Sequence, residues 1–166
     1  MDGRGKSTDA GSDAGKRFSR RRLVRIFVAM TTSNFSPRSG LAAVLKIAAV
    51  YNLLWGAWQI LAPSSFFHVM GMEPVNYLMI WQGLGMVIGL YGIAYYWASF
   101  NYIRHWPIVA IGLMGKVFGP IGFIYNIALG TAPYSFGYTL IPNDLIWWIP
   151  FTMMLLDAKK AGFPLR

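Results

Sequence analysis

Cysteine is absent from this 166-residue chain, and only two histidines occur. Without cysteine, the sequence excludes disulfides, thiolate metal sites and cysteine-based redox chemistry. His68 and His105 both fall in predicted loops, so neither a metal or haem site nor any cofactor is predicted. The apolar segments also lack a serine–histidine arrangement, an HExxH motif and paired carboxylates. No catalytic residue is therefore predicted, and an enzyme is not favoured.

Charge is also scarce. Charged residues make up 13% of the chain and hydrophobic residues 55%, whereas an ordinary soluble domain has about a quarter charged residues. This balance predicts a membrane protein of one domain, in which the bilayer supplies the apolar surroundings.

Residues 1–40 differ from the rest because Gly, Ser, Lys and Arg dominate and basic residues outnumber the acids. Such a segment buries too little apolar surface to fold alone, so we predict a disordered, basic cytoplasmic tail. Ser19–Arg25 is similar to a twin-arginine export signal, but the apolar stretch Ile26–Met30 is shorter than the about 7 to 15 residues that a signal needs. A juxtamembrane tail is favoured, and Met30 is an alternative start codon.

Four apolar segments follow, at about 41–62, 78–100, 107–129 and 139–157. Each approaches the roughly 20 residues that cross a bilayer as a helix, which predicts an all-α, integral membrane four-helix bundle. Basic residues lie in the tail, at Arg104 and in the C-terminal end 158–166, whereas the other two loops have none. By the positive-inside rule both termini are cytoplasmic. Attraction of the basic residues to anionic lipid accounts for the net charge of +9, so no nucleic-acid partner is expected.

Polar residues inside apolar segments are the candidate site residues, because such residues usually face the bundle interior. Gly112, Gly115, Gly119 and Gly122 recur at helical spacing on one face of the third segment, the kind of face on which membrane helices pack closely. The buried amides are expected either to line one cavity or to form an interhelical hydrogen-bond network. The ligand-binding or ion-pair candidates are Lys116, Asp144, Asp157, Asn52, Gln59, Gln82, Asn126, Trp55 and Trp147.

Two lysines lie within these segments, at different depths. Lys46 is close to the start of the first segment, so its stem can carry the ammonium to the headgroups. Lys116 lies about 13 Å deep at about 1.5 Å per residue, which predicts a partner inside the bundle. That partner is a bound ligand or one of two aspartates: Asp157 if the fourth helix begins at Asn143, Asp144 if it begins at Thr139.

Four blocks of sequence carry a family resemblance: Tyr51–Gly56, Trp81–Met86, Arg104–Val109 running on to Gly115–Phe123, and Asn143–Phe151. They resemble a family of small, uncharacterised bacterial four-helix membrane proteins that often bear the label "alkyl hydroperoxide reductase". The layout is also similar to the DoxX-like membrane proteins, some of which are linked to quinone-coupled oxidoreductases. The resemblance covers about Leu41–Asp157 and implies the bacterial cytoplasmic (inner) membrane. Peroxiredoxin-type reductases work through cysteine thiolates, so that activity does not extend to this chain.

Several functions are compatible with this pattern. The first hypothesis is a binding or accessory subunit that holds a lipid, a quinone or a protein partner, including a second copy of the chain. The alternative is a small transporter or proton-coupled exchanger that uses Lys116. A purely structural partner of another membrane protein would also explain the glycine faces.

Overall fold

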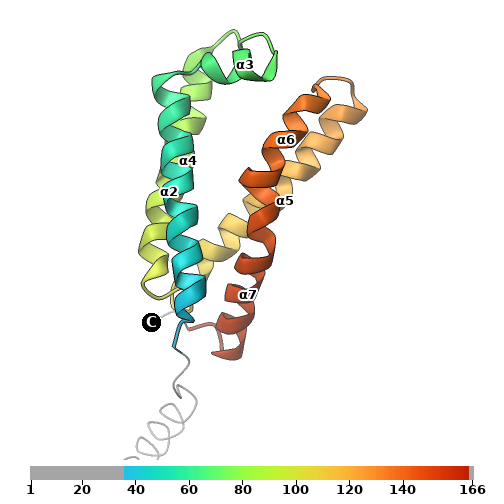
Figure 1. Ribbon diagram of the computed structural model, residues 1–166. Helices are drawn as coiled ribbons and strands as arrows, with labels where there is room; N and C mark the ends of the chain where they lie inside the picture. The colour runs from blue at the N-terminus through green and yellow to red at the C-terminus, as the bar shows by residue number, and fades with distance from the viewer. Residues whose placement is uncertain (1–35, 165–166) are drawn as a thin grey trace, which may run out of the picture. The chain divides into compact units, whose positions relative to one another are not determined.

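The computed structural model describes residues 36–164, and every regular element in this range is helical (Figure 1). The elements are α2 (Ser39–Leu61), α3 (Ser65–Met70), α4 (Leu78–Ser99), α5 (Trp106–Ala128) and a last helical run, Tyr134–Lys160. Four of these helices are long and apolar enough to cross a membrane. The chain is therefore an all-α, multi-pass membrane protein, as predicted.

Three helix boundaries differ from the sequence prediction by two residues or more. Helix α2 begins at Ser39, so the end of the predicted tail, residues 36–40, belongs to the structured part. The last run begins at Tyr134, ahead of the predicted 139, and extends to Lys160. The remaining predictions for the tail, including the export-signal similarity and the start at Met30, concern residues outside the described range, as do residues 165–166.

Helices α2 and α4 lie side by side and form the first hairpin (Figure 1). Glycines allow the close approach, since a Cβ added at Gly56 would lie 2.5 Å from the carbonyl oxygen of Gly85. A Cβ added at Gly92 would lie 2.9 Å from the carbonyl oxygen of Ala49. Backbone-to-backbone packing of this kind is how small residues hold membrane helices together.

The last helical run packs along α5 and forms the second hairpin (Figure 1). It consists of a 3₁₀ turn η1 (Tyr134–Phe136), α6 (Gly137–Leu140), a π-helical segment η2 (Ile141–Leu145) and α7 (Ile146–Lys160). The π segment includes Pro142, which has no N–H to donate to the preceding turn. Single π turns inside longer helices are frequent at functional sites, and this one contains Asn143 and Asp144.

Side chains join the two hairpins at both ends. At the end where α2 begins and α7 finishes, which we call the charged end, Arg38 pairs with Asp157. At the opposite end, the ring centroids of Phe66 in α3 and Phe136 in η1 are 5.9 Å apart. Between these ends, buried side chains of α2, α4, α5 and α7 form a common apolar core: Leu41, Leu45, Ala48, Ala49, Tyr95, Ala98, Val109, Trp147, Phe151 and Met154.

Candidate functional site: a polar pocket between the hairpins

A pocket of about 180 Å³ lies between the two hairpins, and we call it the mid-helix pocket. Its walls come from α2, α4, α5 and the π segment η2. It is lined by Asn52, Ile88, Tyr91, Tyr95, Gly112, Gly115, Lys116, Asn143 and Asp144. Four of these residues, Asn52, Lys116, Asn143 and Asp144, carry an amide or a charged group, although the surrounding helices are apolar enough to cross a membrane. This contrast makes the pocket the candidate functional site.

Lys116 is buried in this pocket, with 6% of its surface exposed. It lies about 15 Å from the start of α5 at Trp106, at about 1.5 Å per residue. Its Nζ donates a hydrogen bond to the carbonyl oxygen of Asn143 at 2.5 Å, and it lies 5.8 Å from the ring centroid of Trp147. An ammonium has three N–H groups. The other two have no hydrogen-bond partner among the described residues.

Asp144 shares the pocket with Lys116 and is 4% exposed. Its carboxylate rests on Gly119, where an added Cβ would lie 3.0 Å from Oδ2. The one hydrogen bond it accepts within the described residues is a long one of 3.3 Å from Asn143 Nδ2. Lys116 and Asp144 form no ion pair in this part of the chain. Both groups therefore retain hydrogen-bonding capacity toward the pocket.

Proline positions explain how the backbone takes part in this site. Pro120 has no N–H, so the Lys116 carbonyl four residues earlier cannot receive the usual helical hydrogen bond. Trp148 Nε1 donates to that carbonyl at 3.1 Å instead. In the other direction, Lys116 Nζ donates to Asn143 of the π segment. Helix α5 and the last helical run are thus joined by two reciprocal hydrogen bonds at the pocket.

Asn52 and Tyr95 complete the polar lining. Asn52 is 5% exposed, and its carboxamide has no hydrogen-bond partner within residues 36–164. The Tyr95 side chain packs directly on Gly112, whose missing side chain leaves room for the phenol ring. Buried polar side chains normally have partners, so the Asn52 amide keeps hydrogen-bonding capacity toward the pocket.

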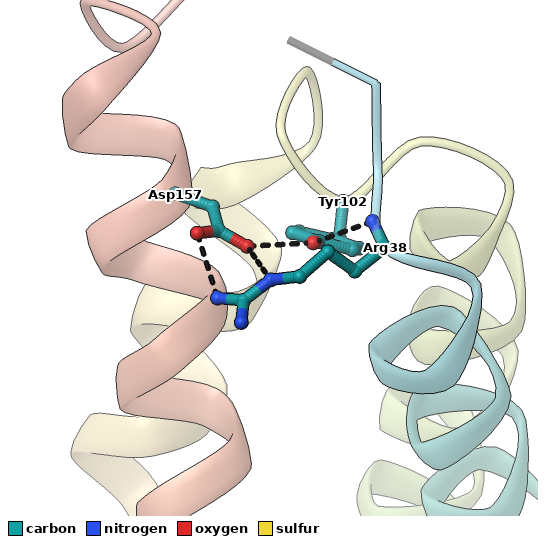
Figure 2. Close-up of polar contacts among 3 residues, drawn as sticks. All are labelled: Arg38, Tyr102 and Asp157. Carbon is teal, nitrogen blue, oxygen red and sulfur yellow. Dashed lines mark hydrogen bonds and ion pairs between the residues drawn. The ribbon is translucent and has the colours of Figure 1, made fainter.

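Asp157 lies elsewhere, at the charged end, where it forms a cluster with Arg38 and Tyr102 (Figure 2). Arg38 donates two hydrogen bonds to its carboxylate, from Nε at 2.8 Å and Nη2 at 2.7 Å. The Tyr102 hydroxyl donates to Asp157 at 2.8 Å and accepts from the backbone N–H of Arg38 at 3.0 Å. Hydrogen bonding to Asp157 raises the pKa of Arg38, and burial raises the pKa of Tyr102. This cluster ties the start of α2 to the end of α7.

These positions distinguish the two aspartates that were considered as partners of Lys116, Asp144 and Asp157. Asp157 is occupied by Arg38, whereas Asp144 lines the same pocket as Lys116. The last helical run starts at Tyr134, earlier than either of the two starts considered from the sequence. The early start brings Asp144 level with Lys116, and the direct hydrogen bond from Lys116 goes to the backbone of Asn143.

The remaining predicted amides do not reach the pocket. Gln82 donates to the carbonyl of Ile60 at 2.9 Å and joins α4 to the end of α2. Gln59 is buried against Gly85, with no hydrogen bond to its Oε1 in the described chain. The expectation that Asn126 faces the bundle interior is wrong. It is exposed, its Nδ2 donates to Gly122 of its own helix, and it accepts a bond from Thr131.

Of the two predicted tryptophans, one lies near Lys116 and the other lies elsewhere. The ring of Trp147 lies near Lys116 Nζ, and its Nε1 donates to the carbonyl of Pro142 at 2.8 Å. Trp55 instead stacks on Tyr51 at 6.0 Å and belongs to the aromatic packing around Phe66.

Lys46 is exposed and lies 5.9 Å from the ring of Phe100, the residue that follows α4 at the charged end. Its side chain therefore extends toward that end, as expected for a snorkelling lysine.

Sequence reasoning missed six residues of these two clusters: Ile88, Tyr91, Tyr95 and Asn143 in the pocket, and Arg38 and Tyr102 at the charged end. Tyr95 could have been found, because it follows Gly92 at a helical spacing of three. Arg38 was assigned to the tail. Asn143 acts through its carbonyl, and no property of its side chain indicates that role.

Comparison of the chain with family models, curated proteins and solved structures gave no match. Residues 36–164 also contain no group of three or more side chains placed to hold a metal ion. The functional interpretation therefore depends on the geometry of the mid-helix pocket.

Proposed function

We propose that this multi-pass membrane protein binds the polar head of a membrane amphiphile, such as a lipid or a quinone, in the mid-helix pocket. The observation that carries the proposal is a pocket in an apolar bundle that is lined both by the carboxamide of Asn52 and by Lys116, whose Nζ uses one of its three N–H groups within the described residues. A charged residue in mid-membrane costs roughly 2.5 to 3.5 kcal/mol even on the permissive insertion scale, and such residues usually serve a function. A polar ligand head would offset part of this cost by pairing with the free groups.

The size and opening of the pocket fit such a ligand. An apolar cavity of about 150 Å³ holds one benzene ring, so a pocket of about 180 Å³ suits one ring or a group of similar size. Ile88 and Tyr91 are partly exposed and Gly115 is exposed, and these residues of α4 and α5 lie at the rim. We infer that the ligand's tail leaves the pocket between α4 and α5.

The resemblance noted from the sequence is consistent with this role. Membership of that bacterial four-helix family, residence in the bacterial cytoplasmic membrane and cytoplasmic termini are parts of the same proposal. So is the role of an accessory subunit, in which the bound amphiphile or a protein partner is delivered to another membrane protein.

Native mass spectrometry of gently extracted protein tests the proposal. The wild type is expected to retain an amphiphile, and Lys116→Met to lose most of it, because the variant removes the cationic donor. Lys46→Met makes the same chemical change on an exposed lysine and is expected to retain the ligand. Equal occupancy in all three proteins would refute the proposal. The same spectra report a protein partner or a homo-oligomer.

A second candidate is a small proton-coupled exchanger. It is favoured by the presence of Lys116 and Asp144 in one pocket without an ion pair between them in the described chain, since either group can then carry a proton. Proton flux into proteoliposomes would support this function, and vesicles that stay impermeable over a broad panel of solutes would count against it.

A further inference from the structure

The ionisable groups of the mid-helix pocket balance in charge. Lys116 is the one basic residue among the lining residues, and Asp144 is the one acidic residue. With both ionised, their charges sum to zero. Transfer of a proton from Lys116 to Asp144 neutralises both groups and leaves the sum unchanged. In either of these states the pocket holds no net charge.

We propose that the occupant of the pocket is an uncharged amphiphile whose head carries hydroxyl or carbonyl groups, rather than a phosphate or a carboxylate. This inference rests on the proposed function and narrows its ligand. An anionic head would bring a net negative charge among helices that are otherwise apolar. Charge that is not compensated is costly in such surroundings, whereas a neutral head adds none.

The hydrogen-bonding groups of the pocket agree with a neutral head. Lys116 and Asn52 offer N–H donors, and Asp144 offers carboxylate oxygens as acceptors. A hydroxyl both donates and accepts, so it can bond to Asp144 and Lys116 together, and a carbonyl can accept from Lys116 and Asn52. An ionised phosphate offers acceptors, and some of its oxygens would face the carboxylate of Asp144.

Competition between two matched lipids tests this inference. Dioctanoylglycerol and dioctanoyl phosphatidic acid have the same tails and differ by a hydroxyl against a phosphate. They are added in equal amounts to the full-length protein in a neutral detergent, and occupancy is read by native mass spectrometry. The wild type is expected to prefer dioctanoylglycerol by at least about tenfold. A decyl-substituted benzoquinol, added in a separate arm, distinguishes a quinol source from a glycerolipid source of the same hydroxyl chemistry.

Two variants examine the charge balance. Asp144→Asn keeps the size of the side chain and removes one negative charge, so the preference is expected to move toward phosphatidic acid by about tenfold or more. Lys116→Gln combined with Asp144→Asn is neutral again and is expected to return the preference to dioctanoylglycerol. If either variant fails to fold, the preference of the wild type for dioctanoylglycerol or for phosphatidic acid decides whether the inference holds.

The outcomes separate this inference from the proposed function. A wild type that prefers phosphatidic acid, with binding lost in Lys116→Met, would overturn the neutral head and leave amphiphile binding intact. A preference unchanged by Asp144→Asn would also overturn the role of charge balance. If none of the three probes binds the wild type more than Lys116→Met, both the inference and the proposed function fail.

Discussion

Replacing Trp148 by phenylalanine tests the hydrogen bonds that join α5 to the last helical run. The indole N–H of Trp148 donates to the carbonyl of Lys116 at 3.1 Å. Pro120 deprives that carbonyl of its ordinary helical donor. The variant leaves the carbonyl without a partner in apolar surroundings, while the aromatic packing of the side chain is largely retained.

The expected cost is about 1 kcal/mol of unfolding free energy. Net contributions of single hydrogen bonds are about 0.5 to 1.5 kcal/mol in folded proteins, and interhelical bonds in membranes average about 0.6 kcal/mol. One kcal/mol corresponds to a change of about fivefold in the unfolding equilibrium. Unfolding by SDS in mixed micelles, followed by far-UV circular dichroism, measures a change of this size.

A double-mutant cycle isolates the hydrogen bond from the loss of indole surface. Pro120→Ala restores an N–H four residues after Lys116, so the carbonyl regains a donor from its own helix. Trp148→Phe is then expected to cost clearly less in the Pro120→Ala background than in the wild type. An equal cost in both backgrounds would show that the indole stabilises the helix pair by packing alone.

Two further predictions concern the packing around the pocket and the charged end. Tyr102→Phe removes a hydroxyl that donates to Asp157 and accepts from a backbone N–H. The unfolding free energy, measured in the same assay, should therefore fall by about 1 to 2 kcal/mol. A fall of less than about 0.3 kcal/mol would contradict the importance of this cluster. Gly112→Ala places a Cβ 2.7 Å from Cε1 of buried Tyr95, which should lower the unfolding free energy by about 1 to 3 kcal/mol. The Cβ of Gly115→Ala meets no atom within 4 Å, so this variant should be tolerated. Similar stability of the two alanine variants would contradict the close packing of Tyr95 on Gly112.

The helical periodicity of the sequence predicts a large part of this fold. Asp144, Trp147, Phe151 and Met154 recur at spacings of three and four, and all four are buried on one side of the last helical run. Lys46 and Lys116 were also separated correctly, because depth along a helix follows directly from residue count. Apolar length and spacing are local properties, so a single sequence contains them.

The partners of the polar groups were harder to predict. Lys116 bonds to a backbone carbonyl of the π segment, and neither the π geometry nor the register between two helices follows from apolar periodicity. Asn126 is close enough to the end of α5 that its amide bonds locally, to Gly122 and Thr131. Arg38 has a basic tail before it, and its pairing with Asp157 depends on the chain returning to the same end after four spans.

The central claim is that the mid-helix pocket holds an amphiphile, and its most direct test is the ligand occupancy of Gly115→Leu by native mass spectrometry. A Cβ added at Gly115 meets no atom within 4 Å, and Gly115 lines the pocket, so we expect a leucine there to fill part of the pocket without replacing Lys116, Asp144 or Asn52. Gly122→Leu is the matched control, since it is equally free of contacts and lies outside the pocket. We predict that Gly115→Leu loses the co-purified amphiphile and that Gly122→Leu retains it. Wild-type occupancy in Gly115→Leu would contradict the account.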